Sequence, residues 1–184
     1  MERSVVALVP LDGYDCQALV DAAVQQGIAL LGGIDCFVRP EDRILLKPNM
    51  LSAAPPYKAV TTHPAVFSAV AGLLHQSGFT HLSYGDSPGN PTATPRKVAD
   101  ASGIAQAAQA WNISPADFDH GVSIAFPRGE AAHSFCLCQG VVDADAVISL
   151  SKMKTHALER ITGAVKNLYG CIYSVNKAAG HARH

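Results

Sequence analysis

Apolar and polar residues alternate along the chain in blocks that predict short strands. Each apolar run is followed by Pro, Gly or a polar residue, which is typical of buried strands in a mixed fold. The predicted strands cover residues 5–9, 44–46, 81–84, 122–126, 134–137 and 146–150.

Apolar residues at helical spacing predict helices between these strands. Asp15 is placed to cap the first helix, which ends before Gly32. The second has Thr62 or His63 as its cap, with Gly78 just after its end. An Ala-rich stretch at 95–111, interrupted at 102–103, predicts a third helical segment. The last predicted helix carries one apolar stripe of Ile161, Ala164, Val165 and Leu168.

Strands that alternate with helices predict an α/β fold. We expect a three-layer, Rossmann-like arrangement in which helices cover both faces of a mostly parallel sheet. The sequence contains no repeat, low-complexity tract or linker, so we expect one α/β domain over residues 1–184.

Polar residues follow three of the predicted strands directly. These segments are Lys47-Pro48-Asn49, the loop 85–89 with Asp86 and Ser87, and the basic segment 151–156. Because the carboxyl ends of parallel strands meet at one edge of a sheet, we expect the three segments to converge there. Their side chains suit a small anionic ligand.

Several of these residues also have a purely structural interpretation. Thr62 and His63 can be helix caps, although a helix N-terminus is also an anion site. The loop 85–89 can be a plain turn, and it matches neither the dinucleotide nor the P-loop fingerprint.

Lysines and histidines supply the candidate chemistry. Lys47, Lys154 and Lys166 can neutralise a carboxylate or phosphate, and His63 or His156 can transfer a proton near neutral pH. Asn49 and Asn167 each follow a lysine closely, which suggests polar networks that can be functional or structural.

Composition narrows the function classes. The formal net charge of the 184 residues is −1 with no block of like charges, so we expect neither a nucleic-acid nor a membrane partner, and a cytoplasmic location. The cysteines are odd in number and lack an iron–sulfur motif. We interpret Cys136 and Cys138 as core thiols in preference to a metal pair.

The motifs ILLKPN, TTHP, YGDSPG, ISLSKMKTH and TGAVKNLYG, in this order, closely resemble the family known as domain of unknown function 362. The resemblance covers roughly residues 5–181. Members of that family often carry or stand beside a ferredoxin-like module with two [4Fe-4S] clusters. No such module occurs here, so the resemblance implies a cluster only through a C-terminal or partner module, and a ferredoxin-like domain or protein as partner. The family usually continues beyond the last motif, so the resemblance implies either a chain truncated at its C-terminus or a short member of the family.

A more distant similarity, to nickel-dependent lactate racemases, implies specific roles. By position, His156 would be an acid/base, Lys166 the anchor of a nickel cofactor or an anion clamp, and His181 a metal ligand. In the alternative, His181 is a solvated residue of a Gly/Ala/basic tail.

Three functions remain open on this basis. The first is an enzyme, either an oxidoreductase or a racemase/isomerase-like enzyme acting on a small carboxylate. The second is a non-catalytic ligand-binding or electron-transfer accessory domain, and the third is a structural scaffold.

Overall fold

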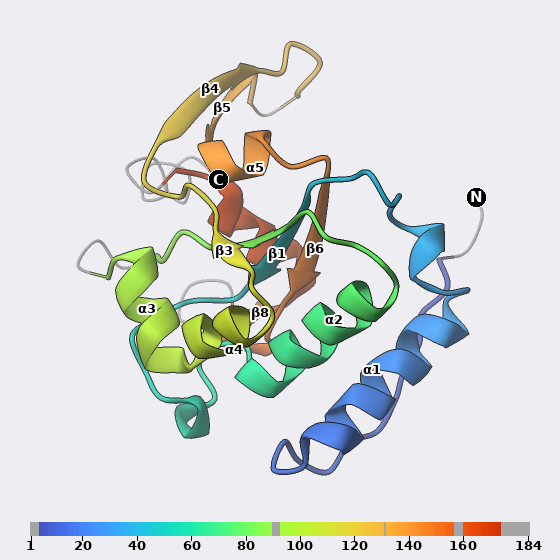
Figure 1. Cartoon of the computed structure of the whole chain (residues 1–184). Coiled ribbons are helices and arrows are strands. Elements are labelled where there is room, and N and C mark those ends of the chain that lie inside the picture. The colour runs from blue at the N-terminus through green and yellow to red at the C-terminus, as the bar shows by residue number, and fades with distance from the viewer. Residues whose placement is uncertain (1–3, 90–92, 131, 157–159, 174–184) are drawn as a thin grey trace.

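The computed structural model describes residues 4–89, 93–130, 132–156 and 160–173 (Figure 1). Its elements follow one another along the chain as helices α, short 3₁₀ helices η and strands β. They are α1 (Gln17–Leu30), η1 (Ile34–Cys36), β1 (Ile44–Pro48), η2 (Pro56–Lys58), α2 (Pro64–Gln76), β2 (Leu82–Tyr84), α3 (Pro95–Ser102), α4 (Ile104–Ala110), β3 (Ser114–Pro115), β4 (Gly121–Ala125), β5 (Ser134–Cys138), α5 (Gln139–Val142), β6 (Ala146–Leu150), β7 (Lys154–His156), β8 (Arg160–Thr162), α6 (Ala164–Asn167) and η3 (Leu168–Cys171).

A four-stranded sheet of order β3-β2-β1-β6 forms the centre of the molecule. All its strand pairs are parallel, and Ile44 of β1 lies opposite Leu82 of β2 on one side and Ala146 of β6 on the other. Strands β4 and β5 form a separate antiparallel hairpin, as do β7 and β8.

Alternate residues of β1 face opposite sides of the sheet, as the two-residue period of a strand requires. Ile44 and Leu46 pack with α2, α3 and α4 in the main core, whereas Leu45 packs with Phe118 and Cys138 in a second cluster on the other face. Helix α1 lies against α2, and its Val24 and Ile28 pack against the main core (Figure 1). The predicted fold class, a parallel sheet between two covering layers, is confirmed.

Helix α2 begins and ends as the sequence predicts. The ring of His63 accepts a hydrogen bond from the backbone N–H of Ala65, and Pro64 occupies the first turn. Just after its end Gly78 has a φ of 88°, which favours glycine. This start fixes His63 beside the carboxyl end of β1.

Three local predictions are wrong. Residues 5–9 form no strand, and Val6 and Leu8 are 83% and 91% exposed. A strand needs a pairing partner, and no described strand pairs with this run. Asp15 does not cap α1, because the N-cap position is Cys16.

The predicted last helix is also shorter than its apolar stripe. Arg160 has a left-handed φ of 62° and begins β8, and Gly163 is extended at a φ of −155°. The helix therefore begins only at Ala164. Ile161 and Val165 are 64% and 87% exposed, so the stripe is not a buried face.

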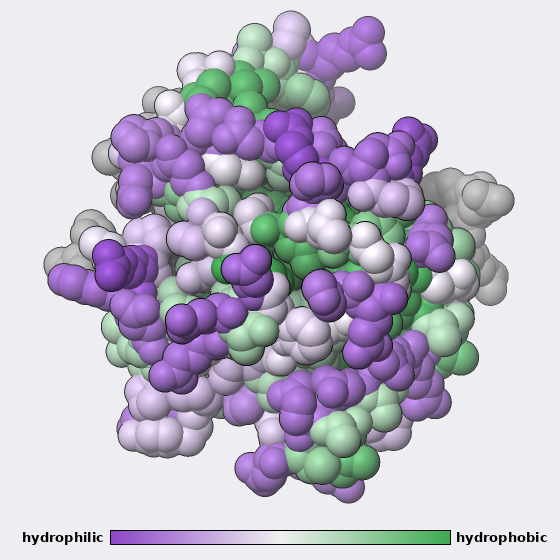
Figure 2. Space-filling view, viewed as in Figure 1, coloured by the Kyte–Doolittle hydropathy of each residue, from purple (hydrophilic) through white to green (hydrophobic). Residues whose placement is uncertain are grey.

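The surface is mostly polar, with an apolar group on the β4–β5 hairpin at the top of Figure 2. Phe126 and Phe135 are 50% and 39% exposed there, and their ring centroids lie 6.0 Å apart. In the described part of the chain, no helix is both long and apolar enough to span a bilayer.

Candidate functional site

The three predicted polar segments do converge at one edge of the sheet. Strands β1, β2 and β6 are parallel, and the segments beginning at Asn49, Gly85 and Ser151 leave their carboxyl ends. The chain goes from β1 through α2 to β2 on one side, while β6 lies on the other side of β1. Such a change of winding direction opens a crevice between two strand ends, here those of β1 and β6, where α/β proteins bind ligands.

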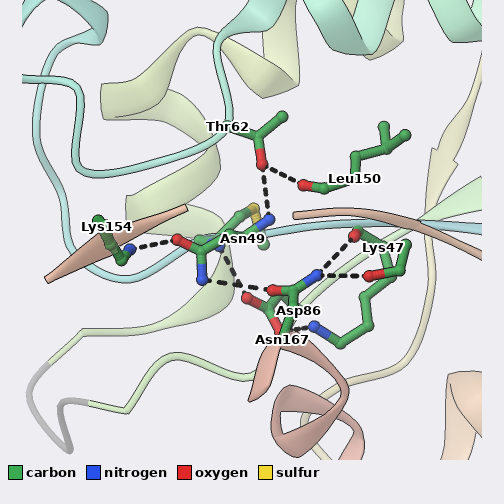
Figure 3. Close-up of polar contacts among 9 residues, drawn as sticks. Lys47, Asn49, Thr62, Asp86, Leu150, Lys154 and Asn167 are labelled. Atoms are coloured by element: carbon green, nitrogen blue, oxygen red, sulfur yellow. Dashed lines mark hydrogen bonds and ion pairs between the residues drawn. The ribbon is translucent and has the colours of Figure 1, made fainter. Parts of the chain in front are cut away.

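A buried ion pair lies at the base of this edge (Figure 3). Lys47 Nζ donates to Asp86 Oδ1 at 2.7 Å, and the side chains are 0% and 4% exposed. Asp86 Oδ2 also accepts the backbone N–H of Met50 at 2.7 Å. A buried pair of this kind tolerates the loss of neither partner, because the remaining charge would be buried alone.

The backbone of Gly170 covers the ion pair. A Cβ atom at this position would lie 1.9 Å from Asp86 Oδ1 and 2.6 Å from Lys47 Nζ, so only glycine fits without movement. The carbonyl of Gly170 also accepts the backbone N–H of Ser87 at 3.3 Å. Ser87 and Asp86 are thereby fixed against η3.

Side-chain amides connect the ion pair to the basic segment (Figure 3). Lys154 Nζ donates to Asn49 Oδ1, and Asn49 Nδ2 donates to Asn167 Oδ1 at 3.3 Å. Asn167 Nδ2 in turn donates to Ser149 Oγ at 2.9 Å and to the carbonyl of Lys47 at 3.3 Å. These contacts join β1, β6, β7 and α6 in one polar network.

Thr62 ties the loop after β1 to the end of β6. Its Oγ1 accepts the backbone N–H of Asn49 at 2.8 Å and donates to the carbonyl of Leu150. Its own N–H donates to the carbonyl of Asn49 at 3.0 Å. With its hydroxyl and its backbone N–H used in this way and 3% exposure, Thr62 connects the strand ends in the structure.

Lys154 is the cation of the network closest to solvent. It is half-buried, and Nζ also donates to the carbonyl of Val60 at 2.6 Å. Burial lowers the pKa of Lys154, the positive charge of Lys152 lowers it further, and Asp86 partly opposes both. Lys152, from the segment after β6, and Lys154, the first residue of β7, are therefore near enough for their charges to interact.

His63 occupies the opposite side of this crevice. Its ring stacks on that of Tyr14, with centroids 4.4 Å apart and planes 13° apart. Burial lowers the pKa of His63, the charge of Lys152 lowers it further, and Asp15 opposes this. Because Nδ1 accepts the N–H of Ala65, the neutral ring carries its proton on Nε2.

A cavity of about 470 Å³ lies at this place. It is bounded by the loop after β1, by the residues before α1 and by the segment after β6. Its lining includes Tyr14, Asp15, Tyr57, Thr61, His63 and Lys152. We call this the crevice cavity; its size is that of small-molecule sites.

Comparison with known proteins decides the family. The profile described as Domain of unknown function (DUF362) matches residues 44–184. The chain belongs to this family. It is 36% identical over 176 residues to the Thylakoid-associated protein sll1697 of Synechocystis sp., an alignment that covers 96% of the chain and 53% of the relative. The chain thus spans about half the length of that relative, and no solved structure matches it.

The structure of this DUF362 chain gathers most of the residues predicted for the site. Six of them share the network: Lys47, Asn49, Thr62, Asp86, Lys154 and Asn167. Ser87 lies beside it through its backbone, and His63 lines the crevice cavity.

The remaining predicted residues lie elsewhere or outside the described chain. His156 is on β7, in register with Arg160 of the β7–β8 hairpin. Lys166 Nζ lies 5.5 Å from the ring centroid of Tyr169, and no hydrogen bond among the described residues connects it to the network. His181 lies outside the described residues.

Sequence reasoning missed three residues of this edge, whereas Lys152 belongs to the predicted basic segment 151–156. Ser149 and Tyr14 enter the edge from two different segments, and Gly170 covers the ion pair. Only Gly170 had a usable signal, as a glycine that ends a motif and permits close backbone approach. The other two depend on packing between distant segments.

The described residues do not form a metal centre. Among them, no group of three or more His, Cys, Asp or Glu side chains is placed to hold a metal ion. Cys138 is fully buried in the second apolar cluster, and Cys136 lies on the same strand. The nickel and [4Fe-4S] centres implied by resemblance thus find no ligand set in this part of the chain.

Proposed function

We propose that this chain binds a small anionic metabolite, such as a carboxylate, in the crevice between the carboxyl ends of β1 and β6. The observation that carries the proposal is a cavity of small-molecule size that Lys152 and His63 line, with the half-buried Lys154 two residues along the chain from Lys152. An anion in this cavity would pair with the charge of Lys152. It would also compensate the cost of keeping Lys154 charged while half-buried.

The same geometry suits proton-transfer or redox chemistry on the bound metabolite. A lysine of lowered pKa is closer to the range in which an amine can exchange a proton near neutral pH. Neutral His63 can donate from Nε2 to an oxygen of the ligand. We therefore assign Lys152 to anion binding, Lys154 to anion binding and proton exchange, and His63 to hydrogen-bond donation.

The buried part of the network has a different proposed role. Lys47 has no exposed surface, so we assign Lys47 and Asp86 to positioning the loops rather than to ligand contact. Asn49, Thr62 and Asn167 would hold Lys154 in its place. Catalytic roles for His156 and Lys166 stay predictions that their own alanine variants would test.

A second function is favoured by one observation. The exposed Phe126–Phe135 pair on the β4–β5 hairpin gives the chain an apolar surface outside the crevice, and such surfaces often contact other proteins. This supports an accessory domain that binds its ligand and docks an electron-transfer partner, such as a ferredoxin-like protein, without turnover.

Calorimetric titration with lactate, pyruvate and inorganic phosphate tests the proposed function. We expect at least one anion to bind, with affinity reduced about tenfold or more in Lys152→Ala and in Lys154→Met, since each removes a hydrogen bond between charged groups. Lys97→Ala, which removes an exposed lysine of α3, is the matched control and should bind normally.

Equal binding by all these variants would place the anion outside the crevice and refute the proposal. If the crevice variants lose binding but no turnover of a bound anion is found with redox or racemisation assays, the accessory function is the better account.

We also propose a cytoplasmic location, because the sequence, with a formal net charge of −1, has no block of like charges that would favour a membrane surface. The name of the relative points to a different place, because it associates that protein with thylakoids. Fractionation of cells that express the chain with its native ends would test this, and recovery in the membrane fraction would refute it.

A further inference from the structure

A second cavity, of about 530 Å³, lies at the carboxyl ends of β2 and β3. Met50, Tyr84 and Phe118 form its apolar wall, and Arg96, Asp100 and Asp119 give it charge. It shares no lining residue with the crevice cavity. We call it the β2–β3 cavity.

Tyr84 supplies a polar group, its hydroxyl, to the lining of this cavity. It is only 8% exposed, and its hydroxyl makes no hydrogen bond with any described residue. Yet in the described chain every fully buried side-chain nitrogen or oxygen has a partner. The hydroxyl therefore keeps accessible surface, and Tyr84 lines the cavity. A hydroxyl that has no protein partner and reaches a cavity can bond a ligand.

The lining is fixed by close packing. A Cβ atom on Gly85 would lie 2.3 Å from the ring of Phe118, so the backbone after β2 and this ring are in direct contact. Phe118 is itself buried, and Tyr84 packs edge-on against Phe67 with centroids 5.7 Å apart. The wall is thus preformed rather than assembled on binding.

Charged side chains of both signs line this cavity. Arg96 and Asp100 lie one helical turn apart on α3, but no ion pair in the described chain includes either of them or Asp119. Asp117 is different, because its carboxylate lies in hydrogen-bond contact with Nδ1 of His120 at 2.8 Å. It also accepts hydrogen bonds from two backbone N–H groups. The unpaired groups are therefore one guanidinium and two carboxylates.

We propose that the β2–β3 cavity binds a small zwitterion of the amino-acid type. The ammonium group would lie between Asp100 and the hydroxyl of Tyr84, which both line the cavity. The carboxylate would pair with Arg96, and the side chain would contact Met50 and Phe118. This proposal is independent of the anion site in the crevice.

The test compares three sets of probes by calorimetry on the whole chain. These are L-leucine and L-phenylalanine, the amines that lack their carboxylate, and the carboxylic acids that lack their amine. We expect at least one amino acid to bind about tenfold or more tightly than its amine and its acid, because each analogue leaves one charged group unpaired. Absence of amino-acid binding, or equal binding of the amine, overturns the proposal.

Variants locate the site. Tyr84→Phe removes only the hydroxyl, so we expect about tenfold weaker binding with an unchanged urea midpoint, which separates ligand contact from a structural role. Arg96→Gln should weaken the binding of the amino acid and leave the binding of the amine unchanged. Glu41→Gln is the control, since Glu41 is an exposed carboxylate on a loop that does not line the cavity.

Lys152→Ala should leave amino-acid binding intact, so that failure here and failure of the crevice proposal are distinguishable. Unchanged affinity in Tyr84→Phe and Arg96→Gln would place the ligand elsewhere and overturn the assignment.

Discussion

Lys47 lies at the carboxyl end of β1 and Lys154 comes shortly after the neighbouring strand β6, yet their surroundings differ sharply. Lys47 is fully buried, and its charge is matched by Asp86 at 2.7 Å. Lys154 is half-buried and donates to neutral oxygens; burial lowers its pKa, Asp86 partly opposes this, and Lys152 lowers it further. A buried charge with an opposite charge in contact stabilises the fold, whereas a half-buried charge at an opening can contact a ligand. The presence of lysine in a motif therefore does not by itself indicate binding.

The largest effect should come from breaking the enclosed pair. We expect Lys47→Met to lower the free energy of unfolding by about 3–5 kcal/mol, because the carboxylate of Asp86 would remain buried without its partner. Lys47→Met combined with Asp86→Asn should recover part of this loss, since the amide oxygen can still accept the N–H of Met50. Urea denaturation measures both.

Arg43→Gln is the control for this experiment. It breaks the exposed Arg43–Asp145 pair, whose side chains are 60% and 42% accessible, and should leave the urea midpoint nearly unchanged. If Lys47→Met is no less stable than Arg43→Gln, the buried Lys47–Asp86 pair does not stabilise the fold.

A smaller loss of stability should follow from a larger side chain at Gly170, whose backbone covers the Lys47–Asp86 ion pair. Gly170→Ala places a methyl group against Asp86 Oδ1, and we expect a loss of about 1–3 kcal/mol. Gly89→Ala, from the loop after β2, has no atom within 4 Å of the added carbon and should be near neutral in the same urea titration. Equal stability of the two variants would show that η3 does not enclose the ion pair.

Lys154 should give stability a dependence on alkaline pH. Its pKa is lower in the folded chain than in the unfolded chain, so the unfolded chain binds more protons between the two values. Stability should therefore rise with pH across that interval, which ends near 10.5, and Lys154→Met should remove the rise. A slope that persists in Lys154→Met would assign it to another group.

His63 should give the smallest effect, on the acid side. Its pKa is lowered from 6.5, so protonation disfavours the folded chain and stability should fall as pH falls below that value. His63→Asn keeps a side-chain acceptor for the cap of α2 and should flatten this fall in thermal unfolding between pH 5 and 7. An equal fall in His63→Asn would remove His63 as its cause.

The position of the site at one edge of the sheet could be predicted from the sequence, because it depends only on the order of the strands along the chain. Parallel strands bring their carboxyl ends together, so Lys47, Asp86 and Lys154 had to be neighbours once β1, β2 and β6 were parallel. Which of them pair could not be predicted. That depends on register and on η3, which brings Gly170 back over the edge from the end of the chain's described part.

Local pattern failed where it lacked tertiary support. The run at residues 5–9 has the composition of a strand but no partner, and the helical stripe at Ile161 is interrupted by Arg160 and Gly163 in non-helical conformations. The crevice cavity joins Tyr14, His63 and Lys152, which are separated by long stretches of sequence. No spacing rule connects such residues.

Titration of His63 by NMR in the presence of small anions shows directly whether an anion binds in the crevice. An anion bound beside Lys152 would offset the charge that lowers the pKa of His63. The account predicts that saturating lactate, pyruvate or inorganic phosphate raises this pKa in the native chain and leaves it unmoved in Lys152→Ala. An anion that binds, as judged by calorimetry, without moving the pKa of His63 would contradict the assignment of the crevice as the site.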